Sequence, residues 1–253
     1  SDTPFSYFKG YKYIDTDNVA HVYKSGDAFP IPEDFAGDFI LLEEIWEAVP
    51  GVVGVYLSKN GSDENDGATR DRAVATFNQA YALLKNMTGD KKMIVVTGNY
   101  PFTGGFPETN EMLTITGDGS GTSVLDLYSD YIVMKGPITF ENIKLSQTTT
   151  QGGKRLATYG HELVIGEGVE QAAKPMLLRF GTMSPTSLAS GEKVTLKSGT
   201  FKGIELGSFY NYDNPGSTAG AEIVIDGAEV EGIALTSDGW LGTHRGNYFT
   251  KDV

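Results

Sequence analysis

One five-residue pattern occurs three times in this chain, as Ile94-Val-Val-Thr-Gly98, Leu113-Thr-Ile-Thr-Gly117 and Ile132-Val-Met-Lys-Gly136. The residue numbers at which successive copies begin differ by 19 in both cases (113 − 94 and 132 − 113). A unit this short cannot bury its own apolar side, so copies must stack until their apolar residues form a ladder. The pattern predicts a parallel β-solenoid, and the alternative is a set of evenly spaced sandwich strands.

Alternate residues of a strand point to opposite faces, so each copy should have one face toward the core and one away from it. The predicted core face is wholly apolar and comprises Ile94, Val96, Leu113, Ile115, Ile132 and Met134. The predicted outward face comprises Val95, Thr97, Thr114, Thr116, Val133 and Lys135. The glycine that closes each copy permits the sharp corner that stacking requires.

The second half of the chain repeats at a longer interval. Val194-Thr-Leu196 matches Ile223-Val-Ile225, and Leu206 matches Leu235, with the same difference in residue number, 29, for both (223 − 194 and 235 − 206). Longer turns on one side of a solenoid would account for the larger interval.

Amino-acid composition and net charge exclude several kinds of site and disfavour several kinds of partner. The 253 residues include 32 glycines and no cysteine, which suits a turn-rich β protein and excludes disulfides, thiolate metal sites and cysteine nucleophiles. The net charge of −13 disfavours nucleic acid and anionic membranes as partners, because both require concentrated Lys and Arg. No apolar run is long enough to predict membrane insertion.

The chain divides into residues 1–51 and residues 52–253. In the first part, Tyr11, Tyr13, Val19, Val22 and Tyr23 flank the turn residues 15–18, which predicts a hairpin, and we interpret this part as a cap or appendage. In the second part, Val74, Phe77, Tyr81 and Leu84 form one apolar face and predict a helix over about residues 72–85. This helix is expected to lie across the open end of the solenoid.

The polar loop of residues 58–67 suggests calcium as a possible cofactor, with Asp63, Glu64 and Asp66 as candidate ligands. Ala73 occupies the twelfth position of an EF-hand alignment and cannot bind a metal, so that motif is absent. A plain turn of Asn, Asp and Gly is the alternative interpretation, and no other cofactor is indicated.

The run from Val55 to Thr69, the segment Ala75-Thr-Phe-Asn-Gln-Ala80 and the strand at Ile94 occur in an order that resembles pectate-lyase-like proteins. These are right-handed parallel β-helices with an N-terminal capping helix, and the likeness is strongest to versions found in large bacterial surface proteins. The resemblance covers about residues 52–240. It implies a fold but no single activity, because the superfamily includes polysaccharide lyases, glycoside hydrolases, adhesins and inert stalks.

No catalytic set is identified from the sequence. For the lyases of this superfamily, the resemblance implies a Lys or Arg base with calcium held by acidic residues. The outward positions of the three copies contain no carboxylate. The later outward candidates have charges of both signs, as an ordinary solvated surface does: Lys144, Arg179, Lys197, Glu205 and Asp226. A hydrolase needs two carboxylates across a groove, and candidates would come from Asp118, Asp126 and Asp130. Asp118 fits a turn better, and Asp126 ends a strand.

Aromatic residues in the later turns and the tail are candidates for glycan binding, because rings stack on the C–H faces of sugars while polar side chains pair with hydroxyls. The candidates are Phe209, Tyr210, Tyr212, Asp213, Trp240 and Tyr248. Burial at the end of the solenoid core is the alternative role for these rings.

We therefore expect an all-β, right-handed parallel β-helix that is extracellular or displayed on a bacterial cell surface within a larger multidomain protein. Its expected role is non-catalytic recognition of a polysaccharide or other glycan, as in an adhesin. A polysaccharide-degrading lyase or glycoside hydrolase is the first alternative, and a structural stalk or spacer is the second.

Overall fold

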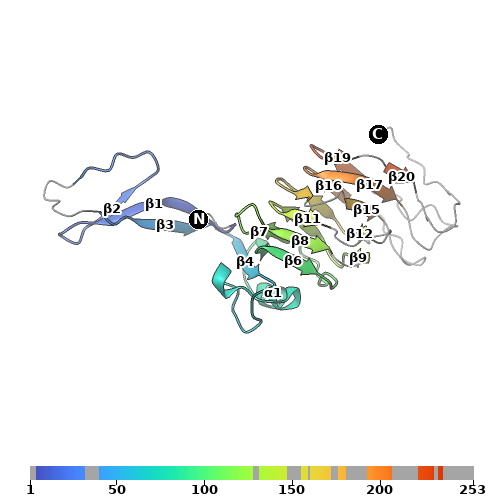
Figure 1. Ribbon diagram of the computed structural model, residues 1–253, viewed down its shortest axis with the longest axis horizontal. Helices are drawn as coiled ribbons and strands as arrows, with labels where there is room; N and C mark the ends of the chain where they lie inside the picture. Colours follow the sequence, from blue (N-terminus) through green and yellow to red (C-terminus); the bar gives the residue numbers. More distant parts are fainter. Residues whose placement is uncertain are drawn as a thin grey trace.

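The computed structural model describes residues 4–31, 40–127, 131–146, 155–158, 160–171, 176–180, 193–206, 222–230 and 233–235. These residues are mostly in β-strands, with one short α-helix and a large parallel sheet (Figure 1). The prediction of a β protein with parallel strands and a helix near its start is confirmed at this level.

Parallel strands form three sheets. The largest sheet has seven strands in the order β18 (Glu222–Ile225), β16 (Lys193–Leu196), β13 (Leu163–Ile165), β10 (Ile138–Glu141), β7 (Leu113–Gly117), β5 (Lys91–Val96) and β4 (Val52–Leu57). The second has β14 (Glu170–Gln171), β11 (Lys144–Ser146), β8 (Val124–Leu127) and β6 (Asn99–Phe102). The third has β19 (Glu229–Val230), β17 (Thr200–Leu206), β15 (Met176–Phe180), β12 (Arg155–Ala157) and β9 (Tyr131–Val133), and β20 (Ile233–Leu235) pairs with β17.

The chain visits these sheets in a fixed rotation. From β7 to β15 it passes through the seven-stranded, the four-stranded and the six-stranded sheet in turn, and it does so three times. Each return to the first sheet places a new strand beside the previous one, so residues far apart in sequence become hydrogen-bonded neighbours.

An apolar ladder runs through the seven-stranded sheet. Its members are consecutive in-register partners: Val55, Ile94, Ile115, Phe140, Ile165, Leu196 and Ile225. All but the last are fully buried. β-Branched and aromatic side chains suit this arrangement, because they pack tightly against the same position of the next strand.

The register predicted from the first repeat interval is wrong. Ile94 pairs with Ile115, an interval of 21 (115 − 94), and Leu113 pairs with Ile138, an interval of 25 (138 − 113). Ile132 lies in a different sheet, where it pairs with Leu156. The five-residue pattern marks strands that end at a corner, and such strands occur in more than one sheet, so spacing by itself could not assign them.

The longer interval in the second half is confirmed. Val194 pairs with Ile223, and Leu206 pairs with Leu235, so both pairs have the interval of 29 that the sequence indicates (223 − 194 and 235 − 206).

The predicted core face is confirmed, because all six of its residues are buried: Ile94, Val96, Leu113, Ile115, Ile132 and Met134. The predicted outward face is wrong in part. Val95, Thr114 and Thr116 are also buried, and Val95 belongs to a second apolar cluster with Tyr56, Ala73 and Met93. This end of the sheet is therefore covered on both faces, which a strand pattern does not reveal.

The helix predicted over residues 72–85 is shorter in the structure. A 3-10 turn, η1 (Arg70–Arg72), is followed by α1 (Phe77–Leu84), whose buried residues Phe77, Ala80 and Leu84 join the main core. Val74 was predicted to lie in the helix. It lies before α1 and forms a β-bridge with Leu57. The helix begins where the Thr76 side chain accepts a hydrogen bond from the Gln79 N–H at 3.2 Å, which makes Thr76 the N-cap.

The loop of residues 58–76 covers the outer edge of β4, the last strand of the large sheet. The Tyr56 N–H donates to the Gly67 carbonyl at 2.8 Å, and the Val74 N–H donates to the Tyr56 carbonyl at 2.9 Å. Asp63 fastens this loop, because its carboxylate accepts bonds from the N–H groups of Ala75 and Thr76 and from the Thr76 hydroxyl, at 2.8 to 2.9 Å. The loop thus satisfies strand groups that would otherwise be unpaired.

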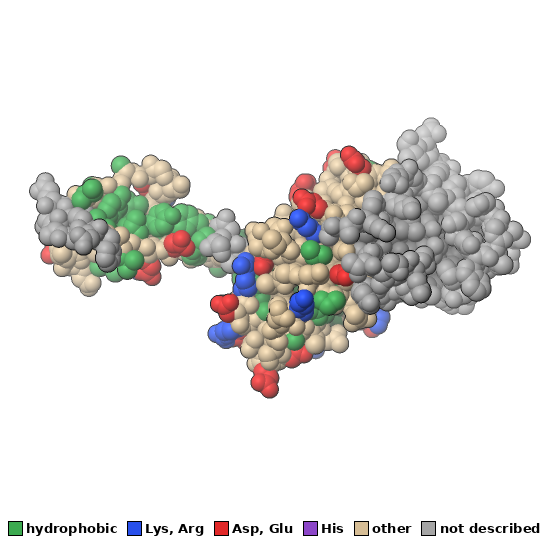
Figure 2. Space-filling model, in the orientation of Figure 1, with side chains coloured by type: hydrophobic (Ala, Val, Ile, Leu, Met, Phe, Trp, Pro, Cys, Tyr) green, Lys and Arg blue, Asp and Glu red, His purple; other side chains and the backbone are tan. Residues whose placement is uncertain are grey.

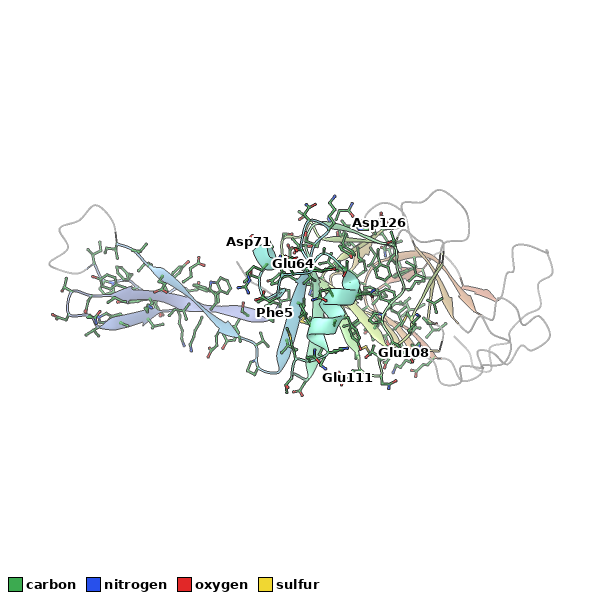
Figure 3. All side chains as sticks on the ribbon, turned by 90° about the horizontal axis from the view of Figure 1, so that it is seen from below. Phe5, Glu64, Asp71, Glu108, Glu111 and Asp126 are labelled. Carbon is green, nitrogen blue, oxygen red and sulfur yellow. The ribbon has the colours of Figure 1, made fainter. Side chains whose placement is uncertain are left out.

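The leading segment forms a separate antiparallel sheet in the order β2 (Ala20–Tyr23), β1 (Ser6–Ile14) and β3 (Glu43–Ala48). The predicted hairpin is confirmed, with Tyr11 opposite Tyr23 and Tyr13 opposite His21. We call this sheet the arm, because it extends away from the parallel sheets (Figure 1). Phe5 lies at its junction with them (Figure 3), and its ring meets that of Tyr56 edge to face at 5.4 Å.

Replacing Asp63 by Ala is expected to lower the free energy of unfolding by about 1–2 kcal/mol, because the substitution removes three hydrogen bonds that fix the loop and the helix start. Urea denaturation of the purified chain measures this change. Glu64→Ala is the matched control, since no side-chain bond of Glu64 is found among the described residues, and it should shift the midpoint little. Equal midpoints for the two variants would contradict the role given to Asp63.

Candidate functional site

A groove of about 430 Å³ lies over the corner between the seven-stranded and four-stranded sheets. Its polar lining comes from neighbouring strands and turns, and Pro4 reaches it from the arm side. The lining side chains used below are Thr116, Glu141, Asn142, Lys144 and Glu170.

Strand register brings these side chains together. Thr116 and Glu141 are partners at the ends of β7 and β10, and Lys144 and Glu170 are partners on β11 and β14. Thr116 lines the groove but is buried, so the polar side chains that the groove presents on these neighbouring strands are those of Glu141, Lys144 and Glu170.

Residues with a left-handed backbone form the corner. Asn142 has φ +48° and Gly168 has φ +68°, a region that favours Gly and tolerates Asn. A Cβ at position 168 would lie 2.4 Å from Asn142 Oδ1, so only Gly fits there. The Asn142 N–H donates to the Glu167 carbonyl at 2.8 Å, and the Gly117 N–H donates to the Asn142 carbonyl at 3.2 Å. These hydrogen bonds join the turns that follow β7, β10 and β13.

Each of the two carboxylates in the groove has a lysine beside it. Lys91 Nζ is 2.6 Å from Glu141 Oε1, and Lys144 Nζ is 3.5 Å from Glu170 Oε2. These pairs are partly exposed and contribute little to stability, but they hold donors and acceptors side by side. Such a surface can exchange hydrogen bonds with a polyhydroxylated ligand.

Asp118 anchors the turn beside the groove. Its side chain is 2% exposed, and it accepts bonds from the hydroxyls of Ser120 at 2.6 Å and Ser123 at 2.8 Å. Arg70 Nε lies 3.2 Å from Asp118 Oδ2. Burial disfavours the charged carboxylate, but these hydrogen bonds and the charge of Arg70 outweigh burial, so the pKa of Asp118 lies below its ordinary value of 3.8. Asp118 is thus a structural turn residue, as the sequence indicated.

The glycan-binding candidates from the sequence, Phe209, Tyr210, Tyr212, Asp213, Trp240 and Tyr248, all lie outside the described residues, as does Asp130. The calcium candidates lie within them. Asp63 is bonded to the helix start, Asp66 forms an ion pair with Arg72, and Glu64 is exposed. Within the described ranges, no three His, Asp or Glu side chains are grouped closely enough to hold a metal ion.

The groove residues Glu141 and Glu170 were missed in the sequence, and Lys144 appeared only as a solvated charge. The missing signal is an interval of 25, which separates Ile115, Phe140 and Ile165 (140 − 115 and 165 − 140) and likewise Thr116 and Glu141 (141 − 116). The shorter interval of the five-residue pattern concealed it, because that pattern linked strands of different sheets.

Comparisons with protein-family models, curated proteins and solved structures return no match for this chain. In the part of the chain that the structure describes, no helix is long and apolar enough to cross a membrane.

Replacing Asp118 by Asn should lower the free energy of unfolding by about 1–3 kcal/mol at pH 7, because the buried network loses its negative charge and an NH2 group replaces one of the two acceptor oxygens. The pKa of this group is depressed in the folded state, so its contribution is complete above 3.8 and disappears as the pH falls through the folded-state pKa. Urea unfolding of wild type and variant at pH 7 and at about pH 2 tests this, since the difference should shrink in acid.

Asp71→Asn, in the exposed 3-10 turn, is the control and should behave as wild type at both pH values. A deficit of Asp118→Asn that stays constant down to pH 2 would show that lost packing, rather than the carboxylate charge, causes it.

Proposed function

We propose that this chain is a right-handed parallel β-helix of the pectate-lyase-like kind and that it recognises a glycan without cleaving it. The rotation of the chain through three parallel sheets and the buried ladder from Val55 to Leu196 support the fold. In this arrangement α1 covers the open end of the β-helix. The chain would act at a bacterial cell surface as one module of a larger protein, as the likeness of its sequence suggests.

The groove carries the functional part of this proposal. Its ion-paired side chains, Asn142 and the exposed turn backbone offer donors and acceptors for the hydroxyls of a sugar. Both groove carboxylates, Glu141 and Glu170, are engaged by lysines, which suits binding better than proton transfer.

A polysaccharide-degrading enzyme and a passive spacer are the competing functions. One observation supports the enzymatic alternative: lysines lie next to the groove carboxylates. A lyase needs a base and a cation near the uronate. The spacer draws support from the long stacked core, which needs no ligand.

The test is binding of the full chain to an array of plant, mucin and bacterial polysaccharides, with and without calcium, followed by calorimetry on any ligand found. Lys144→Ala together with Glu141→Gln should weaken that ligand at least about tenfold, the effect of one or two lost hydrogen bonds. Lys193→Ala is the matched control, because Lys193 forms a similar exposed ion pair with Glu222 at 3.8 Å.

Absence of binding to every polysaccharide would overturn glycan recognition and favour the spacer. Release of shortened or unsaturated oligosaccharides would establish an enzyme instead. Binding that survives the groove substitutions but is lost in Trp240→Ala or Tyr210→Ala would move the site to the aromatic candidates, and dependence on calcium would implicate Asp63 to Asp66.

A further inference from the structure

The outer strands of the arm are β2 and β3, and β4 is the first strand of the large sheet in chain order. These three edge strands differ in how they are protected from pairing with another chain. The loop of residues 58–76 covers β4. Strand β3 carries Glu43, Glu44 and Glu47, and charged side chains discourage another chain from adding to an edge. Within the part of the arm that the structure describes, strand β2 has neither a covering loop nor acidic side chains.

The hairpin geometry directs the free backbone groups of β2 outward. The Asp15 N–H donates to the Val19 carbonyl at 3.0 Å, and hydrogen-bonded pairs alternate along an antiparallel ladder. Tyr13 with His21 and Tyr11 with Tyr23 are therefore hydrogen-bonded pairs. The N–H and carbonyl groups of Ala20 and Val22 consequently point away from β1, and among the described residues β1 is the only strand beside β2.

The charge pattern of this edge suits a second copy of this chain as the partner. Strand β2 reads Ala20-His21-Val22-Tyr23 and contains no Asp, Glu, Lys or Arg, so two copies can pair there without placing like charges together. Pairing through β3 would oppose glutamates in a chain whose net charge is already −13.

Exposed apolar side chains gather on the same part of the molecule. Of the nine large hydrophobic residues exposed in the described ranges, all but Ile225 lie in the leading segment: Tyr7, Tyr11, Ile14, Val19, Val22, Ile31, Leu41 and Leu42. Figure 2 shows this concentration of hydrophobic side chains on the arm. Val22 is 54% exposed on β2, and Val19 directly precedes that strand. Such a concentration is typical of a surface that another protein covers.

We propose that two copies of this chain associate through antiparallel pairing of their β2 strands, which joins the two arms into one continuous sheet. A twofold axis makes the contact self-complementary, because Ala20 and Val22 of each copy supply both donors and acceptors. The arm extends away from the parallel sheets (Figure 1), and no residue of β2 lines the groove.

Sedimentation equilibrium of the full chain tests this, with a reversible dimer expected at concentrations up to about 100 µM. Val22→Lys should weaken the dimer at least about tenfold, since it adds like charges across the new pair. Ile225→Lys is the matched control, because it places the same charge on another exposed aliphatic position, 43% exposed on β18, and should leave the dimer intact.

Amide hydrogen exchange supplies a second measurement that does not depend on a variant. The amides of Ala20 and Val22 should exchange more slowly as the protein concentration rises, because pairing gives them acceptors. A wild-type chain that is monomeric throughout this range would overturn the proposal. A dimer that persists in Val22→Lys with unchanged exchange at Ala20 and Val22 would also overturn it, and would place the contact elsewhere.

Discussion

The hydrogen bonds and side-chain contacts between successive parallel strands are what the rest of this structure depends on. Among the described residues, no strand of the parallel sheets is longer than seven residues, and β14 and β19 have only two each. Strands this short cannot satisfy their backbone groups or bury an apolar side without a neighbour on each side. The ladder from Val55 to Leu196 supplies those neighbours, and its side chains are fully buried at every step.

This dependence makes sheet edges the critical places in the molecule. At β4 the edge is covered by a loop, and Asp63 in this loop accepts hydrogen bonds from Thr76 at the start of α1. Asp63 was a candidate metal ligand in the sequence, and in the structure it stabilises the loop. At β3 the glutamates have a comparable protective effect by charge. The same reasoning identifies β2 as a place where a further strand can add, and thus relates the architecture to assembly.

The groove is a product of the same stacking. The corner residues Asn142 and Gly168 adopt left-handed conformations one above the other, and the strands that they connect deliver Glu141, Lys144 and Glu170 to one surface. The same strands thus supply the buried contacts of the core and the polar groups of the groove. In our proposal the groove would contact the glycan and the arm would join two chains, so the two surfaces would have separate roles.

The sequence by itself determined the local features: a β protein with apolar core positions at Ile94, Ile115 and Ile132, a helix within residues 72–85, a hairpin at Asp15 and the longer repeat interval of the second half. These follow from alternation, helical periodicity and turn residues, which are properties of neighbours in the chain. Only the tertiary structure decided which strands pair, that Thr116 is covered, and that Glu141 and Glu170 line one groove. Strand register depends on many small contacts between strands that are distant in the chain. Two strands with the same local pattern can belong to different sheets. No local signal could therefore distinguish Ile132 from Ile138 as the partner of Leu113.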